Sequence, residues 1–219
     1  IQAGDENADL DYVDENSLTL NGGAISAGGM DANLLLPAPG NAGSLSAEKD
    51  IVVDGIRPTV GIGMSSYALL AGQTATVTFT FSEPVAGFSN ADLTVPNGTL
   101  TTVNSADGGI TFTATYTPDT YIEDAANTID IDNTGYTDLA GNTGVGTTSS
   151  ANFTIDTKVP VVTNITSSKD DGTYGIGEVI LVSITFDDAI TVTGIPQLEL
   201  ETGVVDRTID YVSGSGTST

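Results

Sequence analysis

The sequence predicts an all-β protein whose strands pack as β-sandwiches. Apolar and polar residues alternate over several runs of five or more positions, which is typical of half-buried antiparallel strands. Glycine-containing turn sequences separate these runs, and no amphipathic helix of three turns is present. Short alternating strands joined by such turns are typical of sandwiches, so we expect two packed sheets rather than a helical or mixed fold.

Three strands can be assigned directly. In residues 74–82 (TATVTFTFS), one face carries Ala75, Val77, Phe79 and Phe81, and the other face carries threonine and serine. Residues 110–116 (ITFTATY) and 180–186 (ILVSITF) alternate in the same way. The turn sequences between the strands are NGG at 21–23, NGT at 97–99, DGG at 107–109 and GSG at 214–216.

The composition excludes several classes of function. Acids outnumber bases 29 to 5, and the net charge of -24 disfavours nucleic acid and anionic membrane surfaces as partners. Cysteine and histidine are absent, which removes disulfides, thiol nucleophiles, histidine bases and typical zinc sites. There is no run of about 18 apolar residues, so no membrane insertion is expected.

An internal repeat predicts the domain boundaries. The segment 51–60 (IVVDGIRPTV) matches 153–162 (FTIDTKVPVV), and 72–85 (GQTATVTFTFSEPV) matches 177–190 (GEVILVSITFDDAI). One complete domain is therefore expected between the two Asp-x-x-x-Pro junctions. The predicted divisions are 1–57, the C-terminal part of a domain, 58–157, the complete domain, and 158–219, the N-terminal part of a domain.

Several motifs together resemble a known family. The segments ATVTFTFSEPVAGFSNADLTVPNGTL, YTDLAGNTG, SSANFTIDTKVP and SSKDDGTYGIGEVI are similar to bacterial Ig-like repeats of giant tandem-domain surface adhesins. The segment AGDENADLDY with SLTLNGGAI resembles the latter half of a second repeat type. The resemblance implies tandem Ig-like Greek-key β-sandwiches, an extracellular location at the cell surface, and calcium at the junctions between domains.

Calcium is the cofactor that the residues themselves favour. It takes six to eight oxygen ligands and needs neither histidine nor cysteine. We expect the ligands on loops at strand ends, near one pole of the complete domain or at its two junctions. These candidates are Asp54, Glu83, Asp138, Asn142 and Asp156.

The partial domains hold further acids. The stretch 5–15 (DENADLDYVDE) contains six, of which Asp9 and Asp11 are the preferred ligand candidates, with the others forming a solvated face. In residues 158–219 the candidates are Asp171 and Asp188, and Asp188 aligns with Glu83 in the repeat. The N-terminal sequence ISAGGMDAN lacks the acid and amide of DLAGN, although Asp31 could substitute.

Three functions are compatible with these features. The first is a structural repeat of an extracellular adhesin or filament, rigidified by calcium. Since neither partial domain can bury its core alone, residues 158–219 are expected to be completed by residues 1–57 of a neighbouring unit, with copies joined head to tail in a filament or tandem array. The alternative is a module that binds carbohydrate or a host protein. A hydrolase using Glu83 with Asp138 is the third, and we expect no enzyme because strand-end acids are far more often structural.

Overall fold

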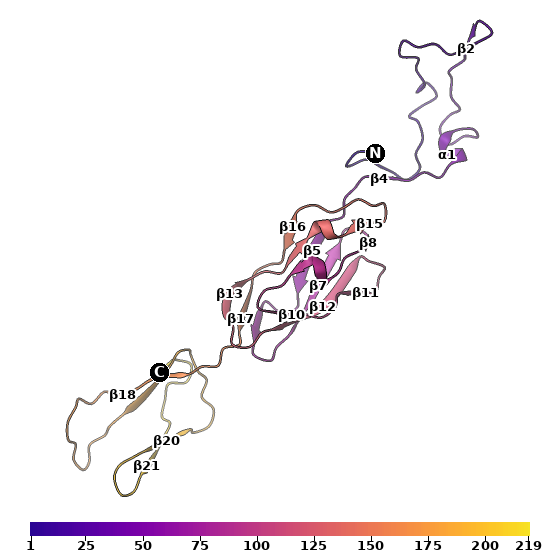
Figure 1. Ribbon diagram of the computed structural model, residues 1–219. Helices are drawn as coiled ribbons and strands as arrows, with labels where there is room; N and C mark the ends of the chain where they lie inside the picture. Colours follow the sequence, from indigo (N-terminus) through magenta and orange to yellow (C-terminus); the bar gives the residue numbers. More distant parts are fainter. The chain divides into compact units, whose positions relative to one another are not determined.

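The computed structural model describes residues 1–219 and confirms the all-β class (Figure 1). The chain divides into two units, Ile1–Thr157 and Lys158–Thr219. The only α-helix is the single turn α1 (Leu45–Glu48), which Ser44 caps by accepting a hydrogen bond from the Ala47 N–H at 3.3 Å. No helix is long and apolar enough to cross a membrane.

Residues 58–157 form a sandwich of two layers. One layer has the order β10-β12-β7-β5, with β11 also paired to β12. The other layer consists of the sheets β13-β17-β6 and β16-β14-β9, and a short pair, β15-β8, lies beside them. The strands of the first layer are β5 (Val60–Met64), β7 (Ala75–Phe81), β10 (Gly98–Leu100), β11 (Asn104–Ser105) and β12 (Thr111–Pro118). The remaining strands are β6 (Ala68–Leu70), β8 (Val85–Ala86), β9 (Leu93–Thr94), β13 (Glu123–Asn127), β14 (Asp130–Asp132), β15 (Thr137–Asp138), β16 (Thr147–Ser149) and β17 (Phe153–Asp156).

The predicted strand at 74–82 is confirmed as β7, and its alternation sets the core. Its four apolar side chains are buried, while Thr76 and Thr80 are exposed. An aromatic cluster fills the space between the layers at the end of β7. The centroid of the Phe81 ring lies 4.9 Å from that of Tyr136 and 5.1 Å from that of Phe88, in edge-to-face geometry. The sandwich therefore has one continuous apolar core.

The outer face of the β7–β12 pair carries threonine in register. Thr80 lies opposite Thr111, Thr78 opposite Thr113, and Thr76 opposite Thr115. Neither strand contains an acid or a base. Threonine suits this position because it is β-branched and polar, and paired threonines stabilise antiparallel strands.

The two flanking segments contain little regular structure and almost no core. Residues 1–57 form β1 (Glu6–Asn7), β2 (Ser26–Ala27), β3 (Met30–Asp31) and β4 (Val53–Asp54), with β1 paired to β4 and β2 to β3. The unit Lys158–Thr219 forms β18 (Val162–Ser167), β19 (Val182–Phe186), β20 (Gln197–Leu200) and β21 (Arg207–Asp210), in two hairpins. No residue from 158 to 219 is buried, so the apolar residues of β19 stay half-exposed.

Candidate metal centre

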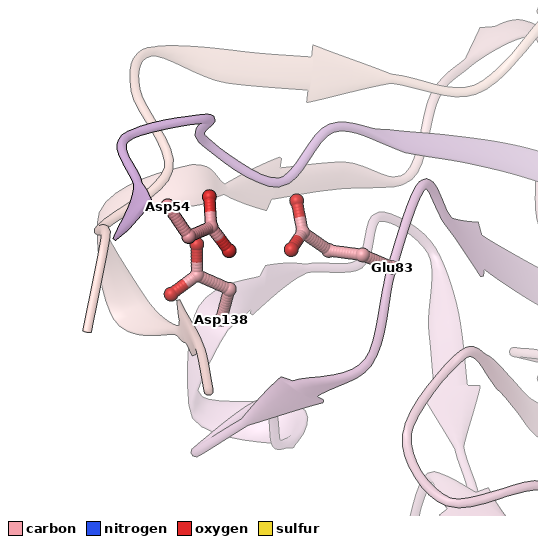
Figure 2. Close-up of side chains that lie close together, drawn as sticks. All are labelled: Asp54, Glu83 and Asp138. Atoms are coloured by element: carbon pink, nitrogen blue, oxygen red, sulfur yellow. The ribbon is translucent and has the colours of Figure 1, made fainter. Parts of the chain in front are cut away.

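Three carboxylates converge at one pole of the central sandwich. One oxygen from each of Asp54, Glu83 and Asp138 lies within 4.8 Å of the others, and Figure 2 shows the side chains facing one another. Asp54 ends β4, Glu83 follows β7, and Asp138 ends β15. Neither unit contains a second group of three such residues at this spacing. Residues distant in sequence thus present only oxygen atoms to one point.

The loop 138–142 holds the most buried member in place. Asp138 is 2% exposed, and its two carboxylate oxygens accept hydrogen bonds from the backbone and side-chain N–H groups of Asn142, both at 2.8 Å. Asn142 also donates from its side chain to the Asp54 carbonyl at 3.0 Å. The predicted ligand candidate Asn142 therefore orients two of the three acids through its amide nitrogen.

The end of β4 supplies Asp54, immediately before the linker of residues 55–57 that leads into the sandwich. Its carboxylate accepts the Ile56 N–H at 3.0 Å, which forms an Asx turn. Three residues after Asp54, the Arg57 guanidinium donates to the Thr143 carbonyl at 2.9 Å. These bonds attach the linker to the loop that carries Asp138, so the position of Asp54 depends on the junction itself.

The negative charges of the three carboxylates repel one another. Burial raises the pKa of Glu83, and the negative charges of Asp138, Asp54 and Glu6 raise it further. Burial also acts to raise the pKa of Asp138, but the hydrogen bonds from Asn142 and the loop backbone outweigh it and lower that pKa overall. The cluster thus concentrates negative charge that a bound cation would neutralise.

Glu6 also reaches the site, although no pattern in the sequence singles it out. It pairs directly opposite Asp54 across β1 and β4. It also lines an open hollow of about 420 Å³ together with Asn7, Asp54, Glu83 and four less polar residues, Ala8, Val52, Val53 and Ile56. The acid-rich segment 5–15 therefore approaches the site through Glu6.

Asp9 and Asp11 lie elsewhere in their segment. Asp9 is exposed. The Asp11 carboxylate accepts the Ser46 hydroxyl at 2.6 Å and the Gly40 N–H at 3.2 Å, and the bond from Ser46 contributes most to lowering its pKa to about 2. Asp11 is thus engaged in holding the segment around α1.

The other predicted ligand residues are dispersed. Asp156 ends β17, where it pairs opposite Glu123. Asp171 is exposed, and Asp188 accepts a hydrogen bond from the adjacent Ala189 N–H. Its neighbour Asp187, which aligns with Ser82 and not with Glu83, forms an ion pair with Lys158 at 3.1 Å.

The central sandwich is similar to a known family of domains. Residues 54–155 match the family model described as bacterial Ig-like domain, a range that starts at Asp54 and ends within β17. No curated protein and no solved structure gives a significant match. The match covers slightly less than half of the chain, and it contains all three residues of the acidic cluster.

Proposed function

Since residues 54–155 are similar to the bacterial Ig-like domain, a family of structural or surface modules, we propose that the chain is a structural repeat of an extracellular bacterial adhesin or filament. In this proposal calcium rigidifies the junction before the central domain, and partial domains of successive copies complete one another head to tail. The observation that carries the proposal is the convergence of Asp54, Glu83 and Asp138.

The geometry of the cluster fits calcium. Calcium–oxygen bonds are about 2.4 Å long, so ligand oxygens on opposite sides of one ion are about 4.8 Å apart. The three carboxylates meet this limit, since their oxygens lie within 4.8 Å of one another. Glu6 of β1 lies opposite Asp54, lines the adjoining hollow and is a further carboxylate beside the cluster. Water would complete the shell, as in other extracellular modules of modest affinity.

A cation at this point would fix the angle between two parts of the chain. Asp54 ends β4 in the segment before the linker, whereas Glu83 and Asp138 belong to the sandwich. Pro58 follows the linker closely and restricts its backbone. One shared ion would therefore neutralise the repulsion between these carboxylates and make the junction stiff.

The partial domains support head-to-tail assembly. In residues 1–57 only Ser44, Val53 and Gly55 are buried, and in residues 158–219 no residue is. Large apolar side chains such as Leu18 (42% exposed) and Ile180 (48% exposed) stay accessible in both. Such segments gain stability only when another layer covers them. A contact between unlike ends repeats along a filament.

Thermal and chemical unfolding of the full chain tests the calcium site. With a dissociation constant of about 0.1–1 mM, about 10 mM calcium should stabilise the central domain by about 1.4–2.7 kcal/mol relative to chelator. Asp138→Asn keeps an acceptor for Asn142 but removes charge, and should lose most of this gain. Asp119→Asn, an exposed acid outside the cluster, is the matched control. Equal calcium shifts in the two variants would refute the site.

Small-angle scattering tests the stiffening. Removing calcium should broaden the distribution of distances and shorten the average dimension of the full chain, because the junction at Asp54 becomes flexible. The Asp138→Asn variant should look the same with and without calcium. An unchanged maximum dimension after chelation of the unsubstituted chain would show that the ion does not rigidify it.

A further inference from the structure

The β1–β4 pair repeats the hydrogen bonding of β13–β17 in the central sandwich. The Gly55 N–H donates to the Asp5 carbonyl at 2.7 Å, as the Thr157 N–H donates to the Ile122 carbonyl at 2.7 Å. The registers also correspond. The equivalent opposed pairs are Glu6–Asp54 with Glu123–Asp156, and Asn7–Val53 with Asp124–Ile155. By this correspondence, β4 is the structural equivalent of β17.

The unit Lys158–Thr219 repeats the first half of the same sandwich. The turn Leu70–Gln73 has its equivalent in Gly175–Glu178, since Gln73 donates to Leu70 at 3.0 Å and Glu178 donates to Gly175 at 3.3 Å through their backbones. Both turns contain a glycine with positive φ, Gly72 and Gly177. The first pair of each antiparallel register also corresponds, with Val60 opposite Phe81 and Val162 opposite Phe186. After that pair, a bulge between Val162 and Asn164 shifts the register of β18–β19.

By these equivalences, each flank has one strand position whose parallel pairing partner is missing. In the central sandwich, β6 (Ala68–Leu70) immediately precedes the turn and pairs in parallel with β17. The equivalent of β6 is the segment 173–175, which belongs to no strand. The equivalent of β17 is β4, which pairs only with β1. Each flank therefore holds one partner of a parallel pair that the central sandwich contains complete.

The side chains show the same incompleteness. Leu69 of β6 is 1% exposed, whereas Tyr174 at the equivalent position is 38% exposed. The β1–β4 pair has an open hollow of about 380 Å³ beside Val53, which is otherwise lined by Ile1, Asp5, Glu6, Asn7 and Leu10. An aromatic ring would fill part of this space. The polar groups at its rim offer acceptors for the Tyr174 hydroxyl in place of the Asp170 carbonyl, to which it donates in the single chain.

We propose that residues 52–54 of one copy form a parallel β-pair with residues 173–175 of a second copy, with Tyr174 entering the hollow beside Val53. The register follows from β6–β17, in which Thr154 lies opposite Ala68 and Ile155 opposite Leu69. It places Val52 opposite Thr173, Val53 opposite Tyr174, and Asp54 opposite Gly175. This pairing rests on the proposed head-to-tail assembly and gives its interface.

A second copy is the occupant that the geometry favours. The two ends of the central sandwich lie at opposite poles, because Val60 pairs with the last residue of β7 and Asp156 pairs with Leu70, which precedes β7. For one chain to pair with itself, residues 158–219 would have to fold back along the whole sandwich, roughly 40 Å. Two copies in line need no such reversal.

Cysteine cross-linking of the full chain tests the register, and the chain contains no cysteine of its own. Val52→Cys and Thr173→Cys are made in separate chains, at two positions that are both exposed. Directly opposed residues of a parallel pair have Cα atoms about 4.8 Å apart, which a disulfide can bridge. The matched control is Val52→Cys mixed with Thr208→Cys, an exposed position on β21. After addition of a thiol oxidant, the first mixture should form covalent heterodimer about tenfold faster than the control.

Each outcome bears on a different part of the proposal. Equal rates in the two mixtures, with assembly still visible by sedimentation, would overturn the register but leave head-to-tail assembly standing. Absence of any assembly would overturn both. A chain carrying both substitutions should give covalent ladders whose yield rises with protein concentration, and a product that stays monomeric at every concentration would show that the pair forms within one chain.

Discussion

At the scale of single residues, Glu83 has the least favourable position in the acidic cluster. Its pKa is raised by burial and by the charges of Asp138, Asp54 and Glu6. A carboxyl group whose pKa is raised on folding destabilises the folded state once the pH exceeds the ordinary value of 4.5. At neutral pH without a cation, the charge on Glu83 therefore opposes folding.

Glu83→Gln should separate the two effects of this charge. Without calcium the variant should unfold at a higher temperature than the unsubstituted chain at pH 7, because one of the mutually repelling carboxylates becomes neutral. With calcium it should gain little, because it has lost a ligand. Thermal unfolding in chelator and in calcium measures both, with Glu199→Gln on exposed β20 as control. A lower melting temperature in chelator would contradict the repulsion.

Asp107 has the opposite shift, because its pKa is lowered where that of Glu83 is raised. Its carboxylate accepts the Thr111 N–H at 2.9 Å and the Ser105 hydroxyl at 2.9 Å, and these bonds lower its pKa to about 2, the Thr111 bond contributing most. The stability that this group contributes is present above pH 3.8 and is lost as the pH falls toward about 2.

Asp107→Asn should therefore flatten the acid side of the stability profile. The amide cannot lose a proton, so the denaturant midpoint of the variant should fall less between pH 3.8 and about 2 than that of the unsubstituted chain. Urea unfolding at several pH values in this range makes the comparison. If the two chains lose stability in parallel, Asp107 has no part in the acid sensitivity.

The sequence selects acids that the structure brings together at the sandwich, but it does not select Glu6 of the flank. Glu83 and Asp138 could be selected because each follows a recognisable strand or turn motif, and the structure brings them together with Asp54. Glu6 could not be selected, since its place beside Asp54 depends on pairing between two strands of two residues each. Strands this short leave no alternation to detect.

At the scale of elements, two glycines in edge strands have different environments. A Cβ on Gly98 of β10 would lie 2.5 Å from the Thr117 carbonyl oxygen and 2.6 Å from the Tyr116 ring, whereas a Cβ on Gly61 of β5 would meet nothing within 4 Å. The Tyr116 ring is fully buried and packs edge-to-face on Phe153. The close approach of β10 to β12 thus requires glycine at position 98.

Gly98→Ala should destabilise the central domain by about 1–3 kcal/mol, as overpacking of a close contact does. Gly61→Ala should be neutral or stabilising by about 0.4–1 kcal/mol, because it only restricts the unfolded chain. Chemical unfolding of the two variants, monitored by tyrosine fluorescence, provides the comparison. Similar losses in both would show that strand backbone flexibility, rather than the contact with Tyr116, decides the effect.

Element-level prediction followed the strength of the pattern. The alternation of β7 predicts both the strand and its buried face, and the structure confirms it. In β19 the same alternation is present, yet all five residues are half-buried, because the layer that would cover one face is not formed by this unit. The alternation of apolar and polar residues specifies which face of a strand is apolar, but that face is buried only where a second sheet packs on it.

At the scale of the whole molecule, charge should oppose assembly. Each copy carries a net charge of -24, so successive copies repel one another. Screening by salt shortens the range of this repulsion from about 30 Å at 0.01 M to about 8 Å at 0.15 M. The pairing of residues 52–54 with 173–175 relies on backbone hydrogen bonds and apolar contact, which salt does not weaken.

Sedimentation of the full chain in chelator should show stronger association in about 0.15 M sodium chloride than in about 0.01 M. An interface built on opposite charges would respond in the reverse direction, and association that weakens with salt would therefore exclude the proposed pairing. The Tyr174→Ala variant should associate weakly at both salt concentrations, since it lacks the side chain that enters the hollow beside Val53.

The parallel pairing of β6 with β17 also determines how the protein responds to pulling. β6 lies near the start of the central domain and β17 at its end, so tension applied through the two junctions slides these strands past each other. Their hydrogen bonds then resist together in shear instead of opening one at a time, as the bonds of a hairpin peeled from its end would. The proposed pair of residues 52–54 with 173–175 has the same parallel geometry. In a filament assembled in this way, the pairs between copies and the β6–β17 pairs within domains would both resist tension in shear.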